Sequence, residues 1–321
     1  MIMTIERSRL RLLIRSYAPD WIITIFLGFI FLVLETIPGF KRQFSLEDRT
    51  LYHPYAVHER VPPLALYMLC GVAPFVLQMA LNYVTICSWW DLHNSTLGLV
   101  LSLALAAAIT EFTKVTVGRP RPDLISRCMP KAGSTDPTYG LSDASICTQT
   151  NHYIMEDGWR SFPSGHSSLS FAGLGFFAFY IAGKLHLFDR RGCAPKAWAA
   201  LTPLSAAALI AISRTMDYRH HAADVIAGSL LGIVAAYFSY RQYYPSLASP
   251  YCHRPYSPRI PRDGHLPLHS REVPLADQHT GTDEETEREL AAETVRRDEE
   301  GRVLWKDDDG AEQASLRENM S

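Results

Sequence analysis

Charged and polar residues gather in three short segments, and each segment adjoins a long apolar stretch. The first runs from Lys114 to Arg121 and Pro122, the second is Pro163-Ser164-Gly165-His166, and the third holds Ser213, Arg214, His220 and Asp224. Ionisable side chains are costly to place at the edge of a membrane, and those found there are commonly functional. We therefore ask what chemistry the three segments can carry out together.

The residue types in these segments are suited to binding a phosphate group. Lys114, Arg121 and Arg214 supply positive charge, and a guanidinium group can grip two phosphate oxygens at once. Ser164 offers a hydroxyl group, and Gly165 lets the backbone come close to a ligand. Both stand where a helix is expected to begin, and the free N–H groups of a helix N-terminus attract anions. The sequence thus predicts a phosphate-binding cradle.

The histidines can divide a reaction on such a phosphate between them. His220 precedes Asp224 by four residues, so on a helical start the carboxylate can orient the ring and stabilise its positive charge. His220 is then a candidate nucleophile on phosphorus, and His166 a candidate general acid for the leaving oxygen. His221 is adjacent, and spacing alone does not rank the two neighbours. The His-x-x-x-Asp spacing also suits half of a metal site, but the nearby cations disfavour a bare metal ion, so we expect no metal and no cofactor.

Long windows without Asp, Glu, Lys or Arg set the fold class. There are six of them, at residues 21–34, 61–90, 92–110, 161–183, 197–213 and 225–240. A membrane-spanning helix needs roughly 17–25 mostly apolar residues, and charged side chains that reach the headgroups can lengthen the shorter windows. Most windows are apolar on every face, whereas a helix of a soluble protein usually keeps a polar stripe. We therefore expect an all-α polytopic membrane protein with six transmembrane helices rather than a soluble helical core. In the last window Gly228 and Gly232 form a G-x-x-x-G motif, which favours packing within the chain over dimerisation.

Charge divides the chain into a body and a tail. Residues 1–250 carry a net charge of +5 and residues 251–321 a net charge of −7. Prolines and then acidic residues crowd residues 245–321, which we expect to be a disordered acidic tail. Residues 1–20 are a basic N-terminal segment, and residues 21–244 form the expected six-helix membrane domain. The charge pattern gives no support for nucleic-acid binding.

The N-terminal basic residues indicate how the chain is oriented. Four arginines between residues 7 and 15 alternate with apolar residues, as in a segment on the cytosolic face of a membrane. The numbers of Lys and Arg residues on the two sides of the membrane are otherwise nearly equal, so the predicted orientation depends on this N-terminal segment. Six spans then place both termini in the cytosol and the three polar segments on the lumenal or extracellular side. The glycosylation sequences at Asn94 and Asn319 fall on the cytosolic side, so we expect neither to be modified.

Two cysteines lie in the long segment between the third and fourth windows. Cys128 and Cys147 are on the side that faces an oxidising compartment, where a disulfide can form. Two unpaired loop cysteines fit the sequence equally well. With six cysteines in 321 residues, the chain as a whole is not a disulfide scaffold.

The pattern K-x6-RP, then PSGH, then SR-x5-H-x3-D resembles the three-part signature of the type 2 phosphatidic acid phosphatase family, also called lipid phosphate phosphatases. Every signature position is matched, in order, in spacing and in placement between predicted helices three to six: Lys114, Arg121, Pro122, Pro163, Ser164, Gly165, His166, Ser213, Arg214, His220 and Asp224. The resemblance covers roughly residues 15–244 and leaves out the tail. Two further sequences look most like those of the fungal diacylglycerol pyrophosphate phosphatases. They are GRPRPD at residues 118–123 and Tyr-Tyr-Pro at residues 243–245, just after the last window.

This resemblance implies a phosphohistidine intermediate at His220, which ranks it above His221. It implies that Asp224 supports the nucleophile, that His166 protonates the leaving group, and that phosphate is contacted by Lys114, Arg121, Ser164, Gly165 and Arg214. The implied reaction removes phosphate from phosphatidate, lysophosphatidate or diacylglycerol pyrophosphate without a metal. The implied partners are phosphorylated membrane lipids, in an endomembrane (vacuole, ER or Golgi) or the plasma membrane.

Other functions use parts of the same pattern. The vanadate-dependent haloperoxidases share the constellation, but they are soluble, and the apolar windows speak against them. A polyprenyl-pyrophosphate phosphatase would use the same cradle. The basic cluster would also suit a non-catalytic protein that binds or transports lipid phosphates. In a transporter, Glu111 would lie on the path that the phosphate takes. Release of inorganic phosphate separates the enzymes from the last alternative. The sequence also leaves a homo-oligomer open.

Overall fold

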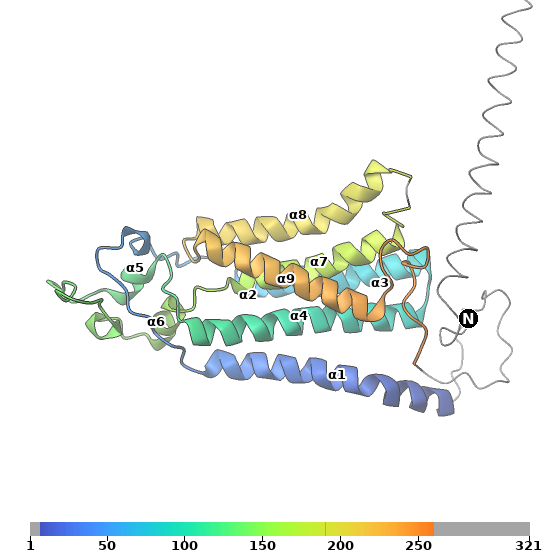
Figure 1. Ribbon diagram of the computed structural model, residues 1–321, viewed down its shortest axis with the longest axis horizontal. Coiled ribbons are helices and arrows are strands. Elements are labelled where there is room, and N and C mark those ends of the chain that lie inside the picture. Colours follow the sequence, from blue (N-terminus) through green and yellow to red (C-terminus); the bar gives the residue numbers. More distant parts are fainter. Residues whose placement is uncertain (1–6, 190, 260–321) are drawn as a thin grey trace, which may run out of the picture. The chain divides into compact units, whose positions relative to one another are not determined.

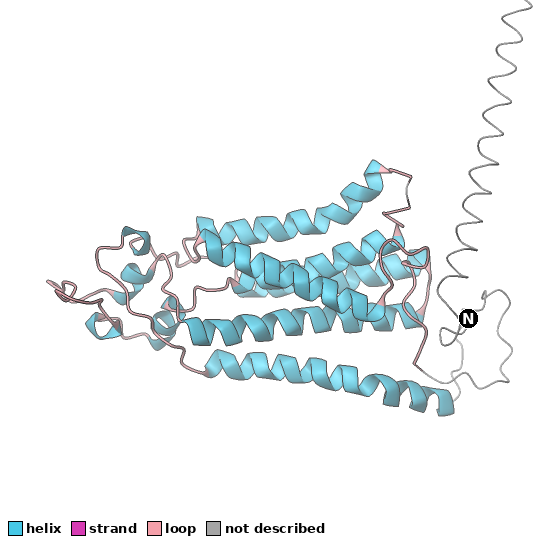
Figure 2. Ribbon diagram, in the orientation of Figure 1, coloured by secondary structure: helices cyan, strands magenta, loops and turns pink. Residues whose placement is uncertain are grey.

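The computed structural model describes residues 7–189 and 191–259. Their regular structure is helical apart from two isolated β-bridges, and the long helices lie side by side in a bundle (Figures 1 and 2). The long helices are α1 (Arg7–Thr36), α3 (Ala73–Thr85), α4 (Trp89–Val117), α7 (Gly165–Lys184), α8 (Ala194–Met216) and α9 (Ala222–Tyr243). The short elements are α2 (Pro63–Tyr67), α5 (Leu124–Cys128), α6 (His152–Gly158), 3-10 turns at Arg49–Leu51 and Ala144–Ile146, and a π-helical turn at Met68–Val72 that joins α2 to α3. The mostly helical fold class is therefore confirmed for the described residues.

Within residues 7–189 and 191–259, five helical stretches are long and apolar enough to cross a membrane. They are Arg11–Thr36, Pro63–Thr85, Trp89–Val117, Ala194–Met216 and Ala222–Tyr243. Their outward side chains are apolar, as at Ile25 and Phe29 of α1 and Leu209 of α8, which are 66%, 60% and 70% exposed. Such exposure would be unfavourable in water but suits contact with lipid chains. These five stretches correspond to five of the six predicted spans.

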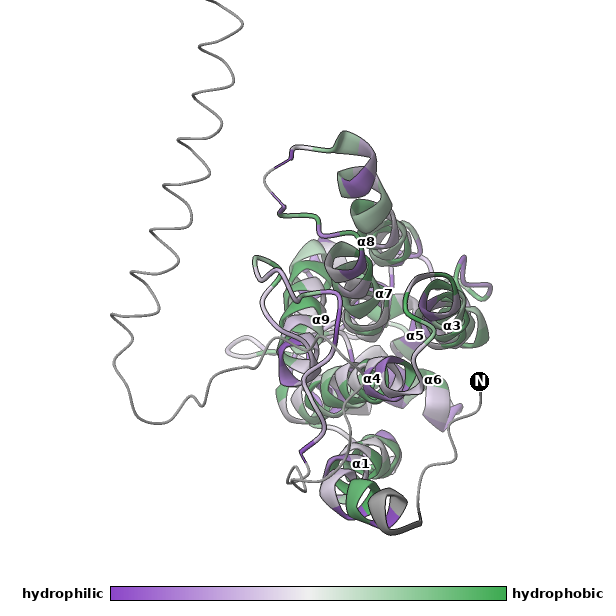
Figure 3. Ribbon diagram, turned by 90° about the vertical axis from the view of Figure 1, so that its right-hand side faces the viewer, coloured by the Kyte–Doolittle hydropathy of each residue, from purple (hydrophilic) through white to green (hydrophobic). Residues whose placement is uncertain are grey.

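The sixth predicted span, at residues 161–183, corresponds to α7, which is not among the five. Small polar and glycine residues lower its hydropathy: Ser167, Ser168, Ser170, Gly173 and Gly175. Figure 3 looks along the bundle and shows α7 in the middle, with α3, α4, α8 and α9 around it. A helix covered by its neighbours needs no apolar outer face, because its polar groups can bond inside the bundle. Accordingly, the Thr110 hydroxyl on α4 donates to Ser168 Oγ at 2.8 Å.

Helix α9 packs closely on α7 through two glycines, a contact we call the glycine seam. A β-carbon at Gly228 would lie 2.5 Å from the carbonyl oxygen of Ser164, and one at Gly232 would lie 2.3 Å from that of Ser168. Both separations are far shorter than van der Waals contact, so each position requires glycine. The G-x-x-x-G motif therefore packs helices within the chain, as the sequence predicted.

A larger side chain in the glycine seam is expected to destabilise the bundle. Gly232→Val forces its β-carbon against the Ser168 carbonyl oxygen, and overpacking of this kind costs about 1–3 kcal/mol. At about 2–4 °C per kcal/mol, the midpoint of thermal unfolding in detergent should fall by several degrees. Gly28→Val is the matched control, because nothing lies within 4 Å of a β-carbon at Gly28. Equal midpoints for the two variants would contradict the close contact.

The connections gather at two opposite ends of the bundle. Residues 37–62, 118–164 and 217–221 lie at the end that carries α5 and α6, and the start of α1 lies at the other end (Figure 1). Asn94 lies inside α4, which begins at Trp89 behind the Ser88 cap. Its side chain is 2% exposed and donates to the Trp90 carbonyl at 2.7 Å. Asn319 lies outside the described residues.

The first part of the predicted disordered tail packs on the helices. Residues 245–259 are described, and Cys252 is 1% exposed, with its thiol 3.4 Å from the Gly183 carbonyl oxygen. Arg259 pairs with Asp20 of α1 at 2.9 Å. The ordered body therefore extends beyond the predicted boundary at residue 244, because this proline-rich segment has buried contacts to make. The rest of the predicted tail, residues 260–321, lies outside the described residues.

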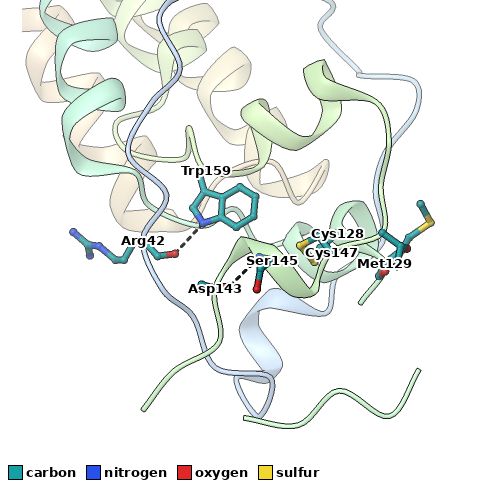
Figure 4. Close-up of a disulfide and its surroundings, with 8 residues drawn as sticks. Arg42, Cys128, Met129, Asp143, Ser145, Cys147 and Trp159 are labelled. Atoms are coloured by element: carbon teal, nitrogen blue, oxygen red, sulfur yellow. Dashed lines mark hydrogen bonds between the residues drawn. A yellow bond between two sulfur atoms is a disulfide. The ribbon is translucent and has the colours of Figure 1, made fainter. Parts of the chain in front are cut away.

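A disulfide and a small apolar core fix the loops at the α5–α6 end. Cys128 and Cys147 are bonded, with α-carbons 4.6 Å apart, which decides between the two sequence alternatives (Figure 4). Around them lies a core made of Phe44, Leu51, Leu124 and Trp159. The Trp159 indole N–H donates to the carbonyl oxygen of Arg42 at 2.9 Å. The connection after α1 is thereby fixed to the connection between α4 and α7.

Candidate active site

The three polar segments meet at the end of the bundle that carries α5 and α6. Lys114 lies in the last turn of α4, Ser164 caps α7, and Arg214 lies in the last turn of α8. The Ser164 N–H donates to the backbone carbonyl of Asp224 at 3.0 Å, which joins the second segment to the third. Arg119 donates to the Asp224 carboxylate at 2.6 Å, which joins the first to the third. The segments therefore form one continuous site.

The start of α7 has the features expected of the cradle. Ser164 Oγ accepts a hydrogen bond from the Ser167 N–H at 3.4 Å, as an N-cap does. A β-carbon at Gly165 would lie 3.0 Å from the Lys114 ammonium nitrogen, so the glycine leaves room for that cation beside the first turn of α7. Helix N-termini and ammonium groups both favour anions. Negative charge is therefore favoured at this point from two directions.

Each predicted cation of the cradle is held by a carboxylate. The pairs are Lys114 with Glu111 at 2.6 Å, Arg121 with Asp157 at 2.7 Å, and Arg214 with Asp217 at 3.0 Å. The two arginines are 7% and 1% exposed. Ion pairs at this degree of burial restrict the direction of each guanidinium plane. The cations are thus oriented before any ligand arrives.

Asp157 on α6 links three arginines and was missed by the sequence analysis. Its carboxylate lies 2.7 Å from Arg121, 2.9 Å from Arg127 and 3.2 Å from Arg219. Burial alone would raise the pKa of Asp157, but the three guanidinium groups outweigh it and hold the pKa at about 2. The carboxylate is therefore charged at neutral pH and keeps the arginines in place. In the sequence, Asp157 is one of several acidic loop residues, and no spacing distinguishes it.

His220 is buried and neutral, with one ring nitrogen occupied. It is 5% exposed, and its Nδ1 lies 2.7 Å from the backbone carbonyl oxygen of Ser161. A carbonyl oxygen only accepts, so Nδ1 carries the proton and Nε2 keeps its lone pair. Burial lowers the pKa of His220 well below its usual value, and the charges of Arg121 and Lys114 lower it further. The neutral His220 ring, with an unprotonated Nε2, is therefore in the protonation state that a nucleophile needs.

Asp224 does not contact His220 as closely as the sequence suggested. Its Oδ2 lies 4.0 Å from His220 Nδ1, but 3.0 Å from the backbone nitrogen of His221 and 3.3 Å from the His221 ring. The Ser161 hydroxyl donates to the same oxygen at 2.5 Å. The reason is that α9 begins at Ala222, so Asp224 turns back to cap the helix start. Asp224 is thus connected to His220 through Ser161 and the helix start.

His166 faces a segment outside the three polar segments. Its Nε2 lies 3.0 Å from the backbone carbonyl oxygen of Val61 and 3.7 Å from Glu59 Oε2. Glu59 also reaches Arg214 at 2.7 Å. A signal was present in the sequence, because Glu59 stands two residues before the apolar window at residues 61–90, where an ionisable side chain is a functional candidate.

Residues 53–61, which we call the bridging segment, contact all three polar segments. The His53 N–H donates to the Pro122 carbonyl in the first, Val61 meets His166 in the second, and Arg60 pairs with Asp217 in the third. The Tyr55 ring lies against two guanidinium groups, 4.5 Å from Arg127 and 4.8 Å from Arg219. The bridging segment is therefore a fourth part of the site.

Comparison with known proteins places this site in a family. The model described as the PAP2 superfamily matches residues 95–247, which include all three polar segments. The relatives described below are similar over more than two thirds of this chain. The chain belongs to the PAP2 superfamily, which confirms the predicted membership. The bridging segment lies outside residues 95–247, which the family model matches.

Named relatives share more than the signature. The chain is 39% identical over 232 residues to "Probable diacylglycerol pyrophosphate phosphatase 1" of Schizosaccharomyces pombe, covering 71% of this chain and 81% of the relative. It is 40% identical over 220 residues to "Diacylglycerol pyrophosphate phosphatase 1" of Saccharomyces cerevisiae, covering 67% and 75%. It is 37% identical over 232 residues to "Lipid phosphate phosphatase 2" of Arabidopsis thaliana, covering 72% and 78%. No solved structure matches the chain significantly.

Proposed function

We propose that this protein is an integral-membrane phosphatase that releases inorganic phosphate from phosphatidate, lysophosphatidate or diacylglycerol pyrophosphate. The observation that carries the proposal is the buried, neutral His220, with Nε2 unprotonated, close to the oriented cations Lys114 and Arg121. Family membership and the names of the relatives support the same reaction.

The reaction proceeds in two steps through a phosphohistidine. In the first, the Nε2 lone pair of His220 attacks phosphorus, and the bond from phosphorus to the leaving oxygen breaks. The leaving oxygen keeps the electron pair and takes a proton from His166. Burial and the charge of Arg214 hold the pKa of His166 at about 3 in the empty site, so the ring has to take up this proton together with the phosphate, whose negative charge raises that pKa. In the second, His166 takes a proton from water, whose oxygen attacks phosphorus. The phosphorus–nitrogen bond then breaks, which restores His220 and releases inorganic phosphate.

Fixed donors meet the charge that develops on the phosphate oxygens. Lys114, Arg121 and Arg214 supply positive charge, while Ser164 and the backbone N–H of Gly165 supply hydrogen bonds at the start of α7. Oriented groups of this kind need little reorganisation as the reaction proceeds. Asp224 positions the nucleophile, because it binds the Ser161 hydroxyl while the Ser161 carbonyl binds the His220 ring.

The proposed enzyme is expected to work without a divalent metal. Purified protein should release inorganic phosphate from phosphatidate in detergent micelles, and excess EDTA should leave the rate unchanged, because side chains already neutralise the phosphate. Orthovanadate should inhibit by occupying the cradle. The measurement is colorimetric phosphate release across a panel that adds diacylglycerol pyrophosphate and a polyprenyl diphosphate. Loss of the rate in EDTA and its return with magnesium would contradict the mechanism. Binding of these lipids with no phosphate release would favour the transport alternative.

We also propose that α7 is a sixth membrane span, so that both termini are cytosolic and the site faces the lumen or the exterior. Support comes from the length of α7, 20 residues, and from its place among four helices that have apolar faces. The N-terminal arginines support the orientation. The proposed location is an endomembrane (vacuole, ER or Golgi) or the plasma membrane.

A glycosylation sequence placed beside the site is expected to acquire glycan. Ala132→Asn creates Asn-Gly-Ser in an exposed loop of the α5–α6 end, and glycan is added only in the lumen. Gln278→Asn, which creates Asn-His-Thr on the opposite side, should stay unmodified. The readout is a gel shift that an endoglycosidase removes. The reverse pattern would invert the proposed orientation. Native Asn94 does not test it, because its side chain is buried inside α4.

A further inference from the structure

Arg214 of the phosphate cradle contacts a second carboxylate besides Asp217. Glu59 of the bridging segment reaches Arg214 with one oxygen at 2.7 Å and Arg219 with the other at 3.1 Å. The first of these oxygens also lies 3.7 Å from Nε2 of His166. Two oxygens on two guanidinium groups, beside the candidate general acid, match what a bound phosphate would present.

The backbone around Glu59 is fixed on both sides. The Ala56 carbonyl accepts a hydrogen bond from Arg219 at 2.9 Å, and the Arg60 N–H donates to Asp217 at 3.0 Å. The Glu59 side chain nonetheless remains 19% exposed, whereas the other carboxylate on Arg214, Asp217, is 1% exposed. Glu59 can therefore turn toward water by side-chain rotation while the segment stays in place.

We propose that Glu59 is a charge gate that selects phosphate groups by their charge. Its carboxylate occupies Arg214 and Arg219 in the empty site, and a phosphate enters by displacing it. This inference rests on the proposed function, because it concerns which phosphates reach the cradle.

The charge of the competing group decides which lipids displace Glu59. A phosphomonoester carries about −1.5 to −2 at neutral pH. A phosphodiester, the headgroup linkage of ordinary membrane phospholipids, carries −1, the same charge as the carboxylate. A diester therefore gains no Coulomb energy over Glu59 on the same arginines, while a monoester or a pyrophosphate does. The gate keeps abundant diester lipids out of the cradle without any contact to their other groups.

Glu59→Gln tests the gate, since it keeps the size of the side chain and removes the charge. We expect inorganic phosphate, measured by calorimetry on the purified protein, to bind about tenfold more tightly. KM for phosphatidate should fall by a similar factor, with a smaller change in kcat. Phosphatidylglycerol, a diester with one charge, should become an inhibitor at about tenfold lower concentration.

Two further variants complete the experiment. Glu47→Gln, in the same connection but exposed, should match the parent in all three measurements. Glu59→Asp keeps the charge, so phosphatidylglycerol should inhibit it no better than the parent. Thermal unfolding of each variant shows whether the fold is kept. If Glu59→Gln does not fold, Glu59→Asp and the parent protein still test the charge gate. Strong inhibition of both by phosphatidylglycerol would overturn it.

Each remaining outcome has one meaning. Unchanged phosphate affinity and unchanged diester inhibition in a folded Glu59→Gln would overturn the gate. A fall in kcat at constant KM would also overturn it, because Glu59 would then act on His166. If the parent releases no phosphate from any lipid but Glu59→Gln still binds inorganic phosphate more tightly, the proposed function fails while the gate stands.

Discussion

Replacing His220 by alanine is expected to lower the rate of phosphate release by about four to six orders of magnitude. The reason is that, in the proposed mechanism, the ring supplies the lone pair that attacks phosphorus, and its Nδ1 is already fixed on the Ser161 carbonyl at 2.7 Å. The measurement is kcat for phosphatidate with purified protein. A brief reaction with lipid labelled at phosphorus should leave acid-labile label on the parent and none on His220→Ala.

His221→Ala is the matched control, because it removes the same ring one residue further on. His221 touches Asp224 at 3.3 Å and caps α9, so a loss of up to about tenfold is expected from weaker positioning. If His221→Ala were the inactive variant and His220→Ala kept its rate and its label, the assignment of the nucleophile would be wrong.

Asp224→Asn is expected to lower kcat by about two to four orders of magnitude, by analogy with other pairs of histidine and aspartate. The substitution removes the negative charge that pairs with Arg119 at 2.6 Å. It also turns an acceptor of the Ser161 hydroxyl into a group that can donate, so the Ser161 carbonyl is no longer fixed under the His220 ring. KM for phosphatidate should change much less than kcat, since Asp224 does not face the phosphate cations.

Arg119→Gln separates the two tasks of Asp224. It removes the ion pair but keeps the carboxylate, so we expect a fall in kcat of about tenfold, far less than for Asp224→Asn. Equal effects of the two substitutions would mean that Asp224 acts only by holding Arg119. A near-normal rate in Asp224→Asn would remove it from the mechanism altogether.

The sequence predicted the class and the three polar segments because both are written in local patterns. Apolar windows reveal helices in lipid, and charged residues at their edges stand out. The predicted pairing of His220 with Asp224 assumed that both lie on a helix, where residues four apart share a face. In the structure α9 begins at Ala222, so His220 precedes the helix and its ring meets the Ser161 carbonyl instead.

Contacts between distant parts of the chain could not be predicted from one sequence. Arg214 and Glu59 are separated by 155 residues, and only the folded loops bring them together. Hydropathy alone does not class α7 with the five candidate spans, because its small polar residues lower the mean hydropathy, whereas the contacts of α7 with the surrounding helices appear only in the fold. The extent of the ordered body beyond residue 244 was missed for a related reason: composition describes the proline-rich segment but not the surfaces it contacts.

The glycine seam has a consequence for how proteins of this kind diversify. Where α9 meets the start of α7, each glycine lies against a backbone carbonyl, and every amino acid carries that same carbonyl. Substitution elsewhere on α7 therefore leaves this contact unaltered, and the distance between His166 and His220 is inherited with the backbone. The connecting loops, which include Glu59, are free of that constraint. New lipid substrates can then be acquired by changing the connecting loops, while the chemistry at phosphorus stays the same.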